Sequence, residues 1–140
     1  MTQLIEIYEK YLQKAVQVRS KASPFAGIFG LGDDPRKHPC HEMFYEHVQD
    51  WVREFEASQP DGVATLEAVR YILEAPLAHE DNQDVYWFLY AAHGLTLELI
   101  PRLSNADCRA LFEWYDSRFP KRNRFPVQQQ VWKLLKDKSR

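Results

Sequence analysis

Apolar residues recur every three or four positions through most of this chain. In the first stretch, which covers residues 3–19, the recurring positions are Leu4, Tyr8, Tyr11, Ala15 and Val18. This spacing places the apolar side chains on one face of an α-helix, whereas a half-buried strand alternates every second residue. Because strand-type alternation never extends beyond a few residues, the pattern predicts an all-α fold.

Five further helices follow from the same spacing and from the residues that bound each stretch. They cover about 39–57, 63–75, 82–100, 104–119 and the segment that starts at 126. Ser104 is a favourable N-cap for the fifth helix of the chain, and Pro126 suits the first turn of the sixth. The stretch 82–100 is apolar on every side, so we expect it to lie at the centre. Gly94 within it costs about 1 kcal/mol relative to alanine, which predicts a close approach by another helix.

The expected architecture is a compact bundle of about six helices joined as antiparallel hairpins. A chain of 140 residues fits one domain, so we expect a single all-α domain over residues 1–140. A short stack of helical repeats is the alternative, although no fixed-period similarity supports it. The connection at about 20–38 is long for such a domain, and its apolar residues predict that it packs, wholly or in part, against the helices.

No pattern in the chain predicts export or insertion into a membrane. The first stretch is charged and amphipathic, unlike a secretory signal. The longest uncharged run, from Val85 to Leu97, has 13 residues, whereas a membrane-spanning helix needs about 20. Cys40 and Cys108 are the only cysteines, and two thiols without a signal sequence indicate a reducing compartment. We therefore expect a cytoplasmic protein.

The small net charge of −2 hides a strong asymmetry along the chain. The segment from Glu42 to Asp84 holds eleven acidic and two basic residues, whereas Lys121 to Arg140 holds seven basic residues and one acidic residue. Such asymmetry bears on partners rather than on the fold. It favours a role in which the acidic half of the chain meets a basic protein.

Four carboxylates follow one another at intervals of four residues on the second predicted helix. They belong to Glu42, Glu46, Asp50 and Glu54, and Glu80, Asp81 and Asp84 add charge at the next hairpin end. Like charges at this spacing destabilise a helix by roughly 0.2–0.5 kcal/mol per pair. We interpret these seven residues as a docking surface for a basic partner. A solvated acidic face with no partner is the alternative.

The segment from His38 to His41, which contains Cys40, is the candidate for a metal site, because thiolate and neutral imidazole are zinc ligands. The spacing argues against a simple site. Cys40 and His47 lie about 10.5 Å apart along a helix, and neither HExxH nor a repeated Glu-x-x-His occurs. We therefore expect no cofactor, with Cys40 packed in the core and the histidines lining the start of the helix. The alternative is zinc bound by His38, Cys40 and His41.

Three other features each have a structural and a functional interpretation. His93 lies in the most apolar helix, where a core histidine is the simpler interpretation than a catalytic one. The glycine-containing loop 27–34 fits no phosphate-binding motif. The C-terminal segment interleaves Phe119 and Phe125 with basic residues, as in proteins that hold single-stranded nucleic acid. A phenylalanine beside a proline is nevertheless expected to pack against the turn, and the acidic body argues against a nucleic-acid partner.

The sequence thus predicts a non-enzymatic cytoplasmic binding protein, of the kind represented by an immunity protein or toxin inhibitor. The motifs of serine hydrolases and of paired-cysteine sites are absent from the sequence, which favours binding without excluding an enzyme. The alternative is a helical protein that binds a metal or a small molecule through His38, Cys40 and His41. A monomer and a homodimer fit the sequence equally well.

Overall fold

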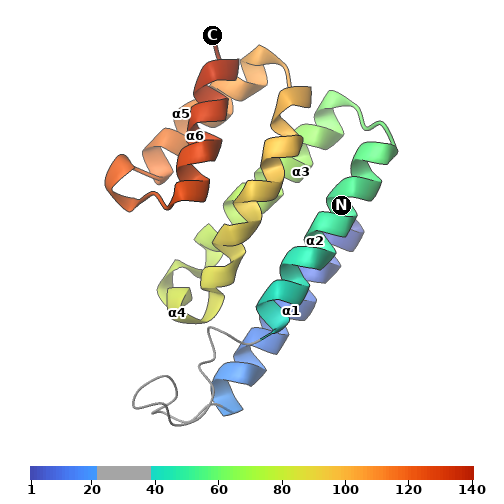
Figure 1. The fold of residues 1–140 in the computed structure, drawn as a ribbon, viewed down its shortest axis with the longest axis vertical. Coiled ribbons are helices and arrows are strands. Elements are labelled where there is room, and N and C mark those ends of the chain that lie inside the picture. Colours follow the sequence, from blue (N-terminus) through green and yellow to red (C-terminus); the bar gives the residue numbers. More distant parts are fainter. Residues whose placement is uncertain (22–38) are drawn as a thin grey trace.

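The computed structural model describes residues 1–21 and 39–140 (Figure 1). Within these residues it contains six α-helices and no strand, which confirms the predicted all-α fold. The α-helices are α1 (Thr2–Lys21), α2 (Cys40–Ala57), α3 (Gly62–Glu74), α4 (Gln83–Tyr86), α5 (Asn105–Arg118) and α6 (Pro126–Lys138). Tighter 3₁₀ segments also occur: η2 (Ala75–Asn82), η3 (Trp87–Glu98), η4 (Ile100–Arg102) and η5 (Lys121–Asn123).

Some parts of the expected architecture are not decided by these residues. The segment 22–38, which makes up most of the predicted long connection, lies outside the described residues. The joining of successive helices as antiparallel hairpins stays a prediction. Among the described helices, none combines the length and the apolar character needed to cross a membrane.

The starts of α3 and α5 are set by side chains that accept free N–H groups of the first turn. The Asp61 carboxylate accepts the Ala64 N–H at 2.7 Å and so starts α3. Ser104 accepts the Asp107 N–H at 3.1 Å, as expected for the N-cap of α5. At the start of α6, Pro126 occupies the first turn as predicted. The local chemistry of these turns therefore determines where the helices begin.

The predicted α-helix over 82–100 is wrong in its helix type. Only the four residues of α4 are α-helical, and η3 continues as a 3₁₀-helix. Its buried residues still recur at intervals of three and four, since Phe88, Ala92 and Leu95 are all buried. Periods of 3.0 and 3.6 residues both produce this spacing over a short run, so the apolar pattern does not distinguish them.

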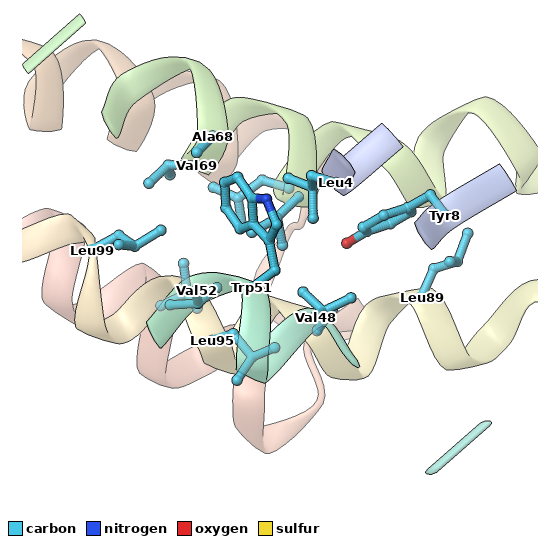
Figure 2. Packing of buried hydrophobic residues seen from close by; sticks show 14 of the residues in the cluster. Leu4, Tyr8, Val48, Trp51, Val52, Ala68, Val69, Leu89, Leu95 and Leu99 are labelled. Atoms are coloured by element: carbon cyan, nitrogen blue, oxygen red, sulfur yellow. The ribbon is translucent and has the colours of Figure 1, made fainter. Parts of the chain in front are cut away.

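The core is formed by buried apolar side chains from α1, α2, α3, η3, α5 and α6. The segment η3 contacts α2, α3 and α6, which confirms its predicted central position. Figure 2 shows members of this one cluster that come from four segments, among them Leu4 of α1, Trp51 of α2, Val69 of α3 and Leu95 of η3. Side chains from segments far apart in the sequence therefore share one interior.

Gly94 marks the close approach that its position in η3 predicts. A Cβ atom built at this residue would lie 3.1 Å from Val127 Cγ2 of α6, which is tighter than an ordinary van der Waals contact. The absence of a side chain at Gly94 thus lets η3 and α6 pack closely.

The Tyr8 hydroxyl leads to a prediction about stability. Tyr8 is buried and packs edge-on against Phe44 and Tyr71, with ring centroids 4.9 and 5.0 Å away. Its hydroxyl has no hydrogen-bond partner among the described residues, and burial raises its pKa. Because an unsatisfied buried polar group costs about 1–3 kcal/mol, we expect Tyr8→Phe to raise the free energy of unfolding, measured by urea denaturation, by about 1 kcal/mol.

The matched control is Tyr11→Phe, because the Tyr11 hydroxyl does have a partner, His47 Nδ1 at 2.8 Å. Loss of that hydrogen bond should lower the free energy of unfolding by about 1 kcal/mol. If both substitutions destabilised the protein equally, the Tyr8 hydroxyl would have a partner after all.

Candidate functional site

The predicted acidic stripe lies on α2. Its carboxylates belong to Glu42, Glu46, Asp50 and Glu54, and all four side chains are exposed. Four residues of an α-helix advance about 400°, so each member is rotated by about 40° from the previous one and the stripe winds around the helix. Asp50 is paired with Arg53 at 4.0 Å, and the other three form no ion pair within the described part of the chain. The stripe therefore keeps most of its negative charge.

The first half of the stripe borders a pocket of about 300 Å³ between α2 and η3, here called the aromatic pocket. It is lined by His41, Tyr45, Trp87, Phe88 and Ala91 together with Glu42 and Glu46. The His41 ring stacks on Phe88 at 4.7 Å and meets Trp87 edge-on at 5.3 Å. Trp87 is 39% exposed, so part of its ring is open to solvent. Aromatic rings beside carboxylates attract guanidinium and ammonium groups.

The second half of the stripe borders a groove of about 360 Å³ between α1 and α2, here called the acidic groove. It is lined by Gln3, Glu6, Ile7, Lys10, His47, Asp50, Trp51 and Glu54. Three carboxylates thus stand against the single ammonium of Lys10. The hydrogen bond between the Tyr11 hydroxyl and His47 Nδ1 connects the two helices at this groove. The winding of the stripe explains why its four members divide between a pocket and a groove.

The remaining acidic candidates lie elsewhere. Glu80 forms an ion pair with Arg118 of α5 at 3.4 Å and lines a different pocket. Asp81 is exposed, and the side chain of Asp84 is outside the described part of the structure. The structure therefore does not bring Glu80 together with the acidic stripe.

The metal candidates are only partly described. His38 lies outside the described residues, and so does the loop 27–34. Cys40 is a buried free thiol whose pKa is raised by burial, an effect that Lys14 of α1 partly offsets. His41 instead lines the aromatic pocket beside η3. The described residues contain no group of three His, Cys, Asp or Glu side chains placed to hold a metal ion. Because His38 is not described, the zinc alternative stays a hypothesis.

His93 is a core residue, as the apolar surroundings of its segment indicate. Its side chain is fully buried, and its Nδ1 atom lies 3.1 Å from the Tyr115 hydroxyl. Its Nε2 atom has no hydrogen-bond partner within the described residues. Burial lowers the pKa of His93 to about 3, and the nearby Leu73 carbonyl offsets this only in part. The imidazole is therefore neutral at pH 7 and does not act as an exposed acid or base.

The polar hydrogens of His93 and Tyr115 can be counted. A neutral histidine and a tyrosine carry two polar hydrogens between their ring nitrogens and hydroxyl. The single hydrogen bond between His93 and Tyr115 uses one of them. The other lies on Nε2 or on the hydroxyl, according to the tautomer. The acceptor close to the imidazole is the Leu73 carbonyl, which raises the pKa of His93.

The basic C-terminal segment corrects one expectation. Phe119 is buried as expected, but Phe125 is 65% exposed rather than packed against its turn. Arg124 has a structural role, because its guanidinium binds Asp116 at 3.0 Å and the Phe119 carbonyl at 2.7 Å. It also lies over the Trp132 ring at 4.5 Å. The exposed aromatic ring of Phe125 is thus available for contacts that the fold does not use.

Comparison with known proteins adds no candidate function. No protein-family model matches the chain, and neither a curated protein nor a solved structure is significantly similar to it.

The spacing in the sequence indicates the carboxylates but not the aromatic pocket beside them. Along α2, His41 comes directly before Glu42 and Tyr45 directly before Glu46. The spacing therefore already places aromatic and acidic side chains together. Trp87 and Phe88 come from η3, more than forty residues further on. Nothing in the sequence pattern of η3 indicates which helix its aromatic residues meet.

Proposed function

We propose that the protein is a non-enzymatic cytoplasmic binding protein that captures a basic protein partner through α2. Its role is that of an immunity or inhibitor protein, which masks a basic toxin or nuclease. The observation that supports this proposal is the aromatic pocket bordered by two carboxylates, Glu42 and Glu46. Such a pocket suits one arginine or lysine side chain of the partner.

The aromatic pocket combines the two attractions that a cationic side chain needs. Trp87 and Tyr45 supply aromatic rings for cation–π contact, worth about 0.5–2 kcal/mol. The two carboxylates supply charge-assisted hydrogen bonds. Glu42 and Glu46 also repel each other at a spacing of four residues, and neither forms an ion pair with a described residue. A basic partner would relieve it on binding.

The acidic groove extends this surface to the other side of α2. Glu6 of α1 joins Asp50 and Glu54 there, so the negative charge spans both sides of the helix. A surface of one sign raises the rate at which an oppositely charged partner associates. The aromatic pocket would then hold one side chain of the partner, and the groove would align the rest of its surface.

Charge reversal tests the proposal. The variant carrying Glu42→Lys, Glu46→Lys and Asp50→Lys should lose at least about a hundredfold in affinity for the basic partner, since like charges replace opposite ones. The matched control carries Glu67→Lys, Glu113→Lys and Asp137→Lys, which change the net charge equally at exposed positions of α3, α5 and α6. Protein recovered by low-salt pull-down with the wild type is then titrated against both variants by calorimetry.

The control should bind nearly as tightly as the wild type, with only the small loss in affinity that the change in net charge causes. A third variant, Trp87→Ala, should lose about tenfold because it removes one wall of the aromatic pocket. Equal weakening by both triple variants would mean that net charge alone matters. Equal affinity of the wild type and the α2 variant would contradict the proposal outright.

A further inference from the structure

A second surface, lined by arginines from the end of α5 and the connection to α6, has the features of a ligand site. It is a pocket of about 500 Å³ between η2, η3 and the connection from α5 to α6, here called the arginine pocket. Its lining includes Glu80, Tyr90, Arg118, Phe119, Arg122 and Phe125. This volume lies within the range of small-molecule sites in proteins, about 300–1,000 Å³.

The arginine pocket offers a ligand the guanidinium of Arg122, which is unpaired among the described residues, and, in competition with Glu80, that of Arg118. Arg124 also lines the pocket, but Asp116 and the Phe119 carbonyl hold its side chain. Arg118 is paired with Glu80 at 3.4 Å, and both side chains are about half exposed. Arg122 is exposed and has no ion pair among the described residues. A ligand anion would therefore bind Arg122 and compete with Glu80 for Arg118.

The same pocket has an aromatic wall that the fold leaves open. Phe125 is 65% exposed, although a ring of this size normally gains from burial. Tyr90 and Phe119 form a second aromatic wall, with ring centroids 6.2 Å apart. An exposed ring beside two arginines matches a ligand that is flat and apolar at one end and anionic at the other.

We propose that the arginine pocket binds a phosphorylated small molecule that carries an aromatic ring, of the class of a nucleoside monophosphate. A phosphate dianion matches two guanidinium groups, because each can donate two parallel hydrogen bonds to its oxygens. The base would stack on Phe125, as bases do on exposed aromatic side chains. This site shares no lining residue with the aromatic pocket or the acidic groove.

Calorimetric titration of the full chain at low salt tests the proposal, with AMP, adenosine, inorganic phosphate and a single-stranded oligonucleotide as separate probes. AMP should bind at least about tenfold more tightly than adenosine or phosphate alone, because only AMP engages both ends of the pocket. Arg122→Ala and Phe125→Ala should each weaken AMP binding by about tenfold. Both side chains are exposed, so the fold should tolerate their loss.

Glu80→Gln is the opposite variant and should strengthen AMP binding several-fold, since it removes the carboxylate that competes for Arg118. Arg70→Ala is the control, because Arg70 pairs with Glu74 on α3 and does not line the pocket. The proposal is overturned if AMP does not bind at millimolar concentration, or if Phe125→Ala leaves the affinity for AMP unchanged. Binding of the oligonucleotide alone would overturn it in favour of a nucleic-acid surface.

Discussion

As the pH falls from 6.5 toward 3, we expect His93 to remove roughly 1.4 kcal/mol of stability for each pH unit. The ordinary pKa of histidine is 6.5, and burial lowers that of His93 to about 3 in the folded protein. Between these values the unfolded chain binds a proton at His93 and the folded chain does not. Acid therefore favours unfolding, so the contribution of His93 is complete above pH 6.5 and is lost as the pH falls through this interval.

The double variant His93→Phe with Tyr115→Phe isolates this effect. It removes the titrating group and its hydroxyl partner together, and it keeps two rings of similar size in the core. Urea denaturation at pH 7, 6, 5 and 4.5 should show a shallower loss of stability in the double variant than in the wild type. By pH 4.5 the difference between the two should have changed by roughly 2–3 kcal/mol.

Tyr115→Phe alone is the control, because it removes the hydroxyl 3.1 Å from Nδ1 but leaves His93 to titrate. Its pH dependence should stay as steep as that of the wild type. If the double variant and the wild type lost stability in parallel, His93 would not be the group that carries the proton linkage. The carboxylates shared by all three proteins cancel in this comparison.

His93 also shows how far the sequence leads into the core. Its position in the most apolar stretch predicts burial, and the residue is buried. Its partner, Tyr115, lies 22 residues further on in α5, and that pairing depends on how η3 and α5 pack. A spacing pattern describes one helix at a time, so it cannot identify partners that come from two.

The ends and faces of the helices were predictable, because their causes are local. Ser104 caps α5 through a residue three positions away, and the buried positions of each helix follow its own period. The helix type of η3 was not predictable, since the apolar spacing fits two periods. Phe125 was wrongly expected to pack against its turn, because exposure depends on whether any distant side chain covers the ring.

The candidate site likewise has one part that the sequence predicts and another that requires the fold. The acidic stripe follows from the spacing of Glu42, Glu46 and the next two carboxylates along one helix. Its chemistry depends on what stands beside it, and Trp87 and Phe88 reach the aromatic pocket only through the packing of η3 against α2. Charge can therefore be read from the sequence, whereas the aromatic walls that give the charge a specific target require the fold.

The packing that places these walls centres on Phe44, and we expect Phe44→Ala to lower the free energy of unfolding by about 3–5 kcal/mol. Phe44 is fully buried and meets Tyr8 at 4.9 Å, Tyr11 at 5.7 Å and Phe88 at 5.0 Å, all edge-on. It thereby joins α1, α2 and η3. The substitution would remove all of these ring contacts and leave a cavity in their place. Urea denaturation at pH 7 measures the loss.

Met43→Ala is the matched control at the position before Phe44 in α2, because Met43 is 42% exposed. It should change the free energy of unfolding by no more than about 0.5 kcal/mol. Phe44→Leu tests the role of packing in a protein that stays folded. It keeps the site apolar and should lower the free energy of unfolding less than Phe44→Ala does. Phe88 is both a neighbour of Phe44 and the ring on which His41 stacks. Phe44→Leu should therefore also weaken binding at the aromatic pocket while the protein stays folded, and unchanged binding would mean that the pocket walls are held independently of this cluster.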